Sequence, residues 1–262
     1  MSILEIKKAK SEKRKLTMVT CYDAWSAKIL NGSGIDMLLI GDSSAMVMHG
    51  FEDTIPATID MIVTHVAAVK RGAPKKFIVA DLPFLAFRGS LDANLEGVRK
   101  VMQAGAQAVK LEGFDGNEAF VKHLTESGIP VMGHVGLTPQ FLNAFGGFRV
   151  QGRDEAGARK IFAEACGLEQ AGCFAVVLEC VPAELAGEIT AALKIPTIGI
   201  GAGQDCDGQV LVLQDLLGLS TGFKPKFVRD YMNGAELIGR ALEKFKADVL
   251  SGEFPSSQET YE

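Results

Sequence analysis

Residues 77–112, with the sequence FIVADLPFLAFRGSLDANLEGVRKVMQAGAQAVKLE, predict a strand, a helix and a second strand in succession. The runs at 77–81 and 108–112 are dominated by apolar residues without strict alternation, which is typical of strands buried on both faces. The segment 91–104 between them has apolar residues at helical spacing. Such a unit indicates a parallel sheet whose crossovers are helices.

The same succession continues along the chain in both directions. We expect eight strands, at approximately 16–20, 37–41, 77–81, 108–112, 130–134, 174–179, 196–201 and 208–213, of which the last has the weakest pattern. Helical segments include 58–71, 91–104, 117–127, 153–171 and 182–193, several of them opened by Asp, Thr or Pro and closed by Gly. Eight such units fit a closed barrel better than an open sheet, so the sequence predicts an α/β fold, a single (β/α)8 TIM barrel.

We expect one domain over residues 1–262, because no linker rich in Pro, Ser or Gly interrupts 16–220. Residues 1–15 form a short amphipathic lead-in. A terminal helix at roughly 230–250 precedes a polar tail, which we expect to be mobile or to lie at a subunit contact.

The composition limits the class of partner. Hydrophobic residues make up 47% of the chain, enough for a sizeable core, and the net charge of −5 lacks the basic excess that nucleic acids or anionic membranes normally require. The five cysteines contain no CxxC pair and favour a reducing compartment. No apolar run reaches the ~18 residues of a membrane helix. We therefore expect a soluble cytoplasmic protein that acts on small molecules.

Ionisable residues end five successive predicted strands. In a (β/α) barrel the carboxyl ends of the strands and the loops after them form the active site, so these side chains are expected to meet at one mouth. Lys110 and Glu112 are two residues apart and thus share a face of their strand. The residues, in chain order, are Asp42 with Ser43 and Ser44, Asp81, Lys110 with Glu112, His134 and Glu179.

Two aspartates with a nearby glutamate form a hard oxygen environment that favours Mg²⁺ over Zn²⁺. We expect Asp42 and Asp81 to be direct ligands, and Glu112 to be a third ligand or to act through a water. A Mg²⁺ ion that keeps coordination positions free for substrate oxygens polarises a carbonyl group and stabilises an enolate. A 2-oxo acid would chelate such a metal well.

The other strand-end residues each allow two interpretations. Glu179 ends a strongly apolar strand, which suits a general base, but a structural ion pair is the alternative. Lys110 either binds a substrate carboxylate or oxyanion, or pairs with Glu112. For His134, a hydrogen bond with the substrate and a hydrogen bond with a backbone carbonyl are equally favoured interpretations.

Two further patterns carry weaker expectations. The glycine run at 199–203 follows a predicted strand, where it either binds phosphate through backbone N–H groups or only permits a tight turn and close backbone approach. His49, His65 and His123 are expected to be ordinary surface residues.

At these residues the chain resembles the ketopantoate hydroxymethyltransferase family, from about Leu16 to Gly252. The segments that carry the resemblance include GIDMLLIGDSSAMVMHG (34–50), VADLPF (79–84), VKLEG (109–113), VMGHVGLTPQ (131–140), GGFRVQGR (146–153) and LECVPAELA (178–186). Minor departures from the family pattern are Ser44, Phe148, Gln204 and Gln214.

The resemblance implies a Mg²⁺-dependent barrel, similar to the phosphoenolpyruvate/pyruvate group. It implies hydroxymethyl transfer from 5,10-methylenetetrahydrofolate to 3-methyl-2-oxobutanoate, giving 2-dehydropantoate in pantothenate (coenzyme A) biosynthesis. It also implies a homo-oligomer, typically a decamer of two pentameric rings. The implied roles are metal ligands at Asp42, Asp81 and Glu112, keto-acid contacts at Asp42, Ser43, Asp81 and Lys110, the proton acceptor at Glu179, and an active-site histidine at His134.

Two alternatives come from different classes. One is a Mg²⁺-dependent carbon–carbon lyase of the isocitrate-lyase-like kind, but the chain has no Lys-Lys-Cys-Gly-His-type segment. The other is a non-catalytic barrel that serves as a scaffold or sensor, which a fold alone never excludes.

Overall fold

The structure of the chain, a computed structural model, describes residues 1–222 and 224–261. It forms two compact units, Met1–Leu211 and Val212–Glu262, which are described separately below. The expected single domain over 1–262 stays a prediction.

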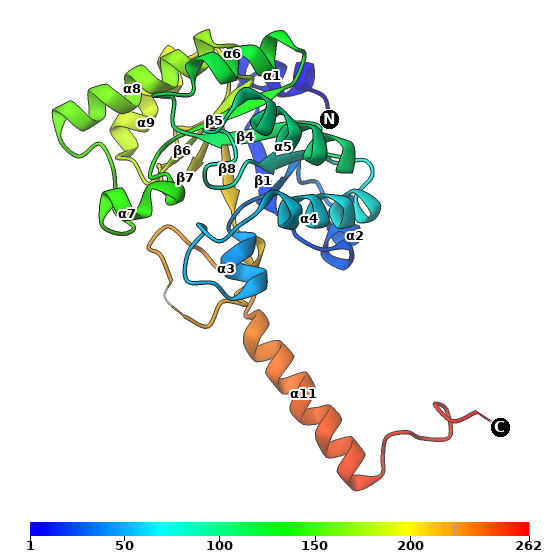
Figure 1. Cartoon of the computed structure of the whole chain (residues 1–262). Coiled ribbons are helices and arrows are strands. Elements are labelled where there is room, and N and C mark those ends of the chain that lie inside the picture. The colour runs from blue at the N-terminus through cyan, green and yellow to red at the C-terminus, as the bar shows by residue number, and fades with distance from the viewer. Residues whose placement is uncertain (223, 262) are drawn as a thin grey trace. The chain divides into compact units, whose positions relative to one another are not determined.

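Eight parallel strands close into a barrel in the first unit, and each strand pairs with its neighbours in chain order (Figure 1). The predicted eight-stranded barrel is therefore confirmed. The strands are β1 (Leu16–Thr20), β2 (Met37–Ile40), β3 (Phe77–Asp81), β4 (Ala108–Glu112), β5 (Val131–Gly136), β6 (Ala175–Glu179), β7 (Thr197–Ile200) and β8 (Gly208–Leu211). Their bounds differ from the expected ones by at most two residues.

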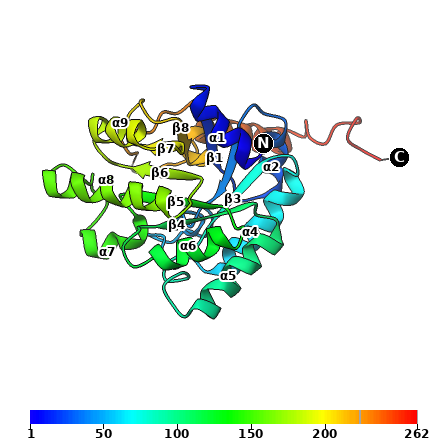
Figure 2. The same cartoon turned by 90° about the horizontal axis from the view of Figure 1, so that it is seen from above.

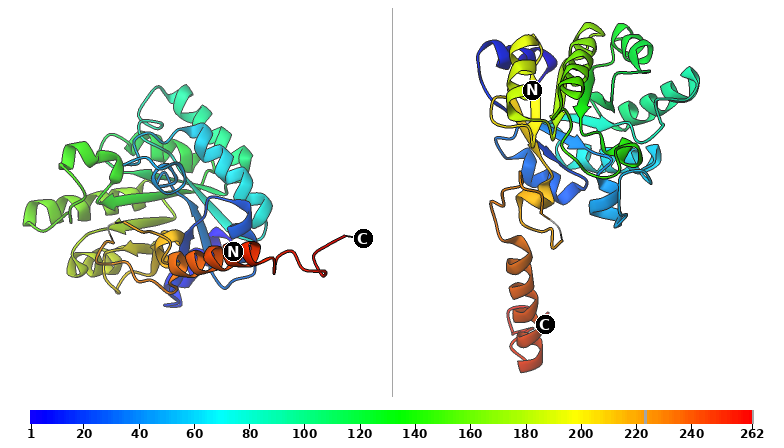
Figure 3. Two further views of the ribbon diagram at one scale, coloured as in Figure 1. Left: turned by 90° about the horizontal axis from the view of Figure 1, so that it is seen from below. Right: turned by 90° about the vertical axis from the view of Figure 1, so that its left-hand side faces the viewer.

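Helices lie outside the strands (Figures 2 and 3). The five predicted helices are present, with side-chain caps at Thr58, Ser90 and Asp154 where the sequence places helix starts. They are α4 (Ile59–Gly72), α5 (Leu91–Ala104), α6 (Glu118–Glu126), α8 (Glu155–Gln170) and α9 (Ala183–Ala192).

The sequence analysis did not predict several shorter helices. Each contains too few turns to show a clear apolar period. They are α2 (Ala24–Asn31), α3 (Ser44–His49), a 3₁₀ turn (Pro139–Phe141) and α7 (Leu142–Phe145).

The barrel interior is filled by apolar side chains, and helix α1 (Ile3–Ser11) contributes to the same cluster. Ile6 and Ala9 are fully buried against strand residues such as Leu16 and Phe77. The ring of Phe77 lies edge-on to Phe174, with centroids 6.0 Å apart. The amphipathic lead-in expected from the sequence is thus a helix whose apolar side completes the barrel core.

Helix α4 corrects one expectation about histidines. His65 lies on its buried side and is only 9% exposed, so the surface prediction is wrong for this residue. Its Nδ1 lies 2.6 Å from the carbonyl oxygen of Tyr22, and its Nε2 lies 3.0 Å from Nε2 of His49. These two polar contacts compensate for burial of the ring.

The second unit contains α10 (Leu213–Leu216) and α11 (Gly234–Ser251). Helix α11 matches the predicted terminal helix, but it begins four residues later than 230 because Met232 and Asn233 lie in the turn before it. It ends at Ser251 and is capped by Gly252, which has φ of 78°, a left-handed conformation that glycine adopts readily. Within residues 1–222 and 224–261, no helix has the length and apolar character to cross a membrane.

Candidate active site

The register of neighbouring strands brings the predicted residues together. Asp81 on β3 is opposite Lys110 on β4, and Glu112 is opposite His134 on β5. Gly136, two residues beyond His134, is opposite Glu179 on β6, so Glu179 and His134 lie on the same face of the sheet. The carboxyl ends of β2 to β6 therefore form one polar cluster at the end of the barrel.

Lys110 forms the central ion pair of this cluster. Its Nζ lies 2.5 Å from Oδ1 of Asp81, and both side chains are almost fully buried. Burial lowers the pKa of Lys110, but the carboxylates of Asp81, Glu112 and Asp42 outweigh burial and hold this pKa above its usual value. Lys110 is therefore a fixed cation, and its closest partner is Asp81 rather than Glu112, the partner that the sequence suggested.

His134 lies between two glutamates. Its Nδ1 is 3.3 Å from Oε1 of Glu112, and its Nε2 is 3.2 Å from Oε2 of Glu179. Burial and the charge of Lys110 lower the pKa of His134, but its contacts with the two carboxylates raise it to about 9. Its Nδ1 also lies 3.3 Å from Nζ of Lys110, so this nitrogen contacts a cation as well as a carboxylate.

Glu179 differs from the other carboxylates in its access to solvent. Its side chain is 18% exposed, whereas Asp42, Asp81 and Glu112 are at most 4% exposed. The contact between Glu179 and His134 is close but poorly aligned for a hydrogen bond. A carboxylate that His134 attracts but does not hold by a well-aligned hydrogen bond can still approach a substrate.

Asp42 lies two residues beyond β2, beside Asp81. Its backbone N–H donates to Oδ2 of Asp81 at 3.2 Å. Burial, followed by the charges of Asp81 and Glu112, raises the pKa of Asp42 well above its usual value. Burial also raises the pKa of Asp81, and Lys110 offsets only part of that rise. Both carboxylates would therefore gain from an additional cation beside them.

The carboxylates fit Mg²⁺ in their donor chemistry. Across 1–222 and 224–261, no three His, Cys, Asp or Glu side chains converge closely enough to form a complete protein-only metal site. Mg²⁺ prefers one or two carboxylates, with water and substrate oxygens completing its shell. A Mg²⁺ site at Asp42, Asp81 and Glu112 stays a prediction.

Ser43 extends the site toward β1. Its Oγ is 2.8 Å from the hydroxyl of Tyr22, which follows β1. A Cβ on the preceding Gly41 would lie 2.7 Å from this Oγ and 3.4 Å from Oδ2 of Asp81. A side chain at position 41 would therefore have to displace the Ser43 hydroxyl.

Gln140 is a site residue that the sequence analysis missed. It lies in the 3₁₀ turn after β5 and is only 4% exposed. Its backbone N–H donates to Oε2 of Glu112 at 3.0 Å, and its Nε2 donates to Oδ2 of Asp42 at 2.9 Å. The segment that contains it was noted for family resemblance, but an amide beyond a strand end carries no signal of its own.

The glycine run at 199–203 shows close packing. A Cβ at Gly199 would lie 2.8 Å from Sγ of Cys206, and one at Gly203 would lie 2.6 Å from Cβ of Ala183. These contacts support close backbone approach as the reason for the glycines, while phosphate binding stays untested.

Solved structures of several barrel enzymes resemble the chain in fold. A 2,3-dimethylmalate lyase of the PEP mutase/isocitrate lyase superfamily has a TM-score of 0.64 at 15% identity, covering 99% of this chain and 91% of its own. Phosphonopyruvate hydrolase, solved with oxalate and Mg²⁺, has a TM-score of 0.65 at 13% identity, covering 99% and 93%. At these identities the likeness establishes the fold alone.

Sequence comparison gives much closer relatives. The 3-methyl-2-oxobutanoate hydroxymethyltransferase of Bdellovibrio bacteriovorus is 56% identical over 260 residues, which is 99% of both chains. The enzyme of the same name from Francisella tularensis subsp. novicida is 51% identical over 261 residues, covering 100% of this chain and 98% of its own. The family model for ketopantoate hydroxymethyltransferase matches residues 1–257. The chain therefore belongs to the ketopantoate hydroxymethyltransferase family.

Proposed function

We propose that the chain transfers a hydroxymethyl group from 5,10-methylenetetrahydrofolate to 3-methyl-2-oxobutanoate, giving 2-dehydropantoate for pantothenate biosynthesis, with Glu179 as the general base. As a family member the chain is a hydroxymethyltransferase. The observation that carries the residue assignment is the partly exposed Glu179 carboxylate beside a buried cluster of cations and carboxylates. That arrangement supports proton removal next to a polarised carbonyl group.

We assign the metal site to Asp42 and Asp81, with Glu112 bound directly or through a water. The raised pKa values of both aspartates support this assignment, because each would gain from a divalent cation. When bound, Mg²⁺ would supply Lewis-acid polarisation of the 2-oxo group. Ser43 and Lys110 lie in the same cluster, where Ser43 would bind the keto acid and Lys110 would stabilise its negative oxygens.

Glu179 would then accept the proton from C3 of the keto acid and leave a carbanion at that carbon. The His134 ring, whose Nε2 lies 3.2 Å from Oε2 of Glu179, would orient this carboxylate toward the substrate. C3 forms a bond to the methylene carbon of the donor, and both carbon–nitrogen bonds of that methylene break. One water supplies the hydroxyl oxygen. The proton from C3 and the two protons of the water end on the product hydroxyl and on the two nitrogens of tetrahydrofolate.

The test is product formation together with isotope exchange. With Mg²⁺, methylenetetrahydrofolate and 3-methyl-2-oxobutanoate, the enzyme should form 2-dehydropantoate. In D₂O without the donor, it should exchange the C3 hydrogen of the keto acid. Cleavage of a carbon–carbon bond in a malate-type substrate without product formation would favour the isocitrate-lyase-like alternative, and neither reaction would favour a non-catalytic barrel.

We also propose a cytoplasmic homo-oligomer, a decamer of two pentameric rings. The family resemblance supports the assembly. The five cysteines are free thiols, which supports a reducing compartment.

A further inference from the structure

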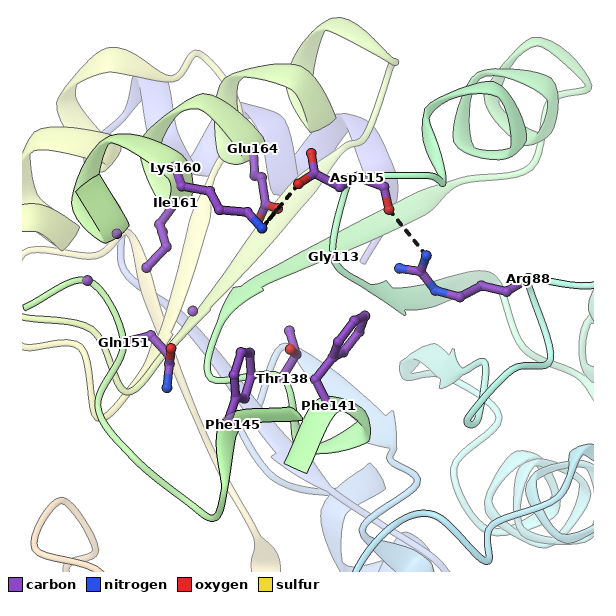
Figure 4. Close-up of a pocket in the computed structure, with 13 residues that line it drawn as sticks. Arg88, Gly113, Asp115, Thr138, Phe141, Phe145, Gln151, Lys160, Ile161 and Glu164 are labelled. Atoms are coloured by element: carbon purple, nitrogen blue, oxygen red, sulfur yellow. Dashed lines mark hydrogen bonds and ion pairs between the residues drawn. The ribbon is translucent and has the colours of Figure 1, made fainter. Parts of the chain in front are cut away.

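A cavity of about 160 Å³ lies at the carboxyl ends of β4 and β5 (Figure 4). Gly113, which directly follows Glu112, and Gly136, the last residue of β5, form part of its wall. A Cβ at Gly136 would overlap the backbone carbonyl of Glu179. The cavity thus shares its wall with the strand ends that carry Glu112 and Glu179.

One side of this cavity is aromatic. The rings of Phe141 and Phe145 lie nearly parallel, with centroids 6.1 Å apart and planes at 29°. The guanidinium carbon of Arg88 lies 5.2 Å from the centre of the Phe141 ring. Phe141 directly follows Gln140, whose contacts with Glu112 and Asp42 fix the start of this wall.

The opposite side is polar. Figure 4 shows Lys160, Glu164 and Asp115 grouped across the cavity from the two phenylalanines. Nζ of Lys160 lies 3.1 Å from Oδ2 of Asp115 and 3.7 Å from Oε1 of Glu164. The Glu164 side chain is only 14% exposed. A largely buried acceptor, Glu164, and a donor that solvent reaches, the 63% exposed Lys160, therefore lie across the cavity from the aromatic side.

We propose that this cavity binds the pterin ring of the folate donor, with one face on the aromatic side formed by Phe141 and Phe145 and its pyrimidine edge toward Glu164 and Lys160. The inference rests on the proposed function, which supplies the donor. A reduced pterin carries an exocyclic amine and a ring N–H that a carboxylate accepts, and an oxo group that an ammonium donates to.

The size of the cavity agrees with this assignment. Pockets that enclose a whole drug-sized ligand measure about 300–1,000 Å³, so this smaller cavity has room for one fused ring system. The aminobenzoyl and glutamate parts of the donor would lie outside it. Because Gly113 and Gly136 line the cavity and belong to the strand ends that carry the candidate active site, a pterin held here would lie on the side of the keto acid.

Two variants test the proposal, each with a matched control. Glu164→Gln removes the acceptor charge, and Glu155→Gln does the same at an 83% exposed position of the same helix. Phe145→Ala removes one ring, and Phe148→Ala removes a 54% exposed ring three residues further along the chain, outside the cavity. Calorimetry measures the Kd of tetrahydrofolate, and steady-state kinetics measure KM for the donor and for the keto acid.

We expect Glu164→Gln to weaken tetrahydrofolate binding about 10- to 100-fold, as loss of a charged hydrogen bond does. Phe145→Ala should weaken it about tenfold. The KM for the donor should rise in parallel, while the KM for the keto acid and both controls change less than about twofold. Parent-like donor binding in both cavity variants would overturn the proposal.

A fragment measurement on the parent enzyme does not depend on the folding of any variant. A tetrahydropterin without the aminobenzoylglutamate tail should bind and compete with tetrahydrofolate. Failure to compete, or tighter tetrahydrofolate binding in Glu164→Gln, would instead place the anionic glutamate tail in the cavity and overturn the proposal. Failure of the proposed function would show differently, because the parent enzyme would form no product from methylenetetrahydrofolate.

Discussion

Glu179 is the carboxylate of the cluster that solvent reaches, and this exposure makes its role testable. Glu179→Gln keeps the shape of the side chain but cannot accept a proton. We expect both turnover and donor-free C3 exchange to fall about 10²- to 10⁴-fold, the usual contribution of a positioned general base. Exchange followed by NMR in D₂O and product assays measure the two rates.

The two losses should have the same size, because one group removes the proton in both reactions. Binding of the keto acid and Mg²⁺ should change little. If Glu179→Gln exchanged deuterium at the parent rate and failed only in transfer, Glu179 would act on the donor, and His134 would become the candidate base.

Asp42 offers a second test, through stability rather than rate. Burial and the neighbouring carboxylates raise its folded-state pKa above the usual 3.8, so the folded state binds protons more tightly than the unfolded state. Stability of the metal-free enzyme should therefore fall as pH rises from 3.8 toward the folded-state pKa. Asp42→Asn should lessen this fall and raise the Tm of the metal-free enzyme at neutral pH.

With added Mg²⁺, the parent should instead have a higher Tm than Asp42→Asn. The ion should raise the Tm of the parent by binding the folded state, but raise that of Asp42→Asn much less. Asp60→Asn, at an 84% exposed carboxylate, serves as the control and should follow the parent. An undiminished Mg²⁺-dependent rise in Asp42→Asn would remove Asp42 from the metal site. Scanning calorimetry with and without Mg²⁺ makes both comparisons.

At the scale of elements, the strands were predictable and several connections were not. Apolar runs such as 77–81 located the strands, and the ionisable residues at five strand ends predicted a cluster that the structure brings together. Gln140 and Phe141 lie in a short turn whose conformation depends on contacts with β2 and β4. His65 was misplaced because helical period alone did not show that its face packs inward and gives both ring nitrogens partners.

Helix α1 provides a prediction at this scale. Ile6 is fully buried in the barrel core, whereas Leu4 on the same helix is 78% exposed. Ile6→Ala should lower the free energy of unfolding by about 2–5 kcal/mol, the usual cost of emptying a core site. Leu4→Ala should cost less than about 0.5 kcal/mol. Urea denaturation measures both, and equal losses would contradict a core role for α1.

At the scale of the whole molecule, the proposed decamer should be visible in solution. Light scattering should give about ten times the 28.0 kDa of one chain. Helix α11 carries exposed apolar residues at coiled-coil spacing, Ile238, Leu242, Phe245 and Val249, which association would cover. Leu242→Glu should therefore lower the mass, whereas Glu243→Lys on the adjoining polar side should not. A parent mass of 28.0 kDa would refute the assembly.

Gln140 links the carboxylate cluster to the cavity through its hydrogen bonds with Asp42 and Glu112 and through the turn in which it lies. Its side chain holds Asp42, its backbone holds Glu112, and the next residue begins the aromatic wall of the cavity. A ligand that orders the carboxylate cluster should therefore also order the cavity. Thermodynamic linkage requires the effect of each ligand on the binding of the other to be equal. The keto acid should tighten donor binding by the same factor by which the donor tightens keto-acid binding. Gln140→Ala should shrink that factor toward one, so the keto acid and the donor would then bind independently of each other.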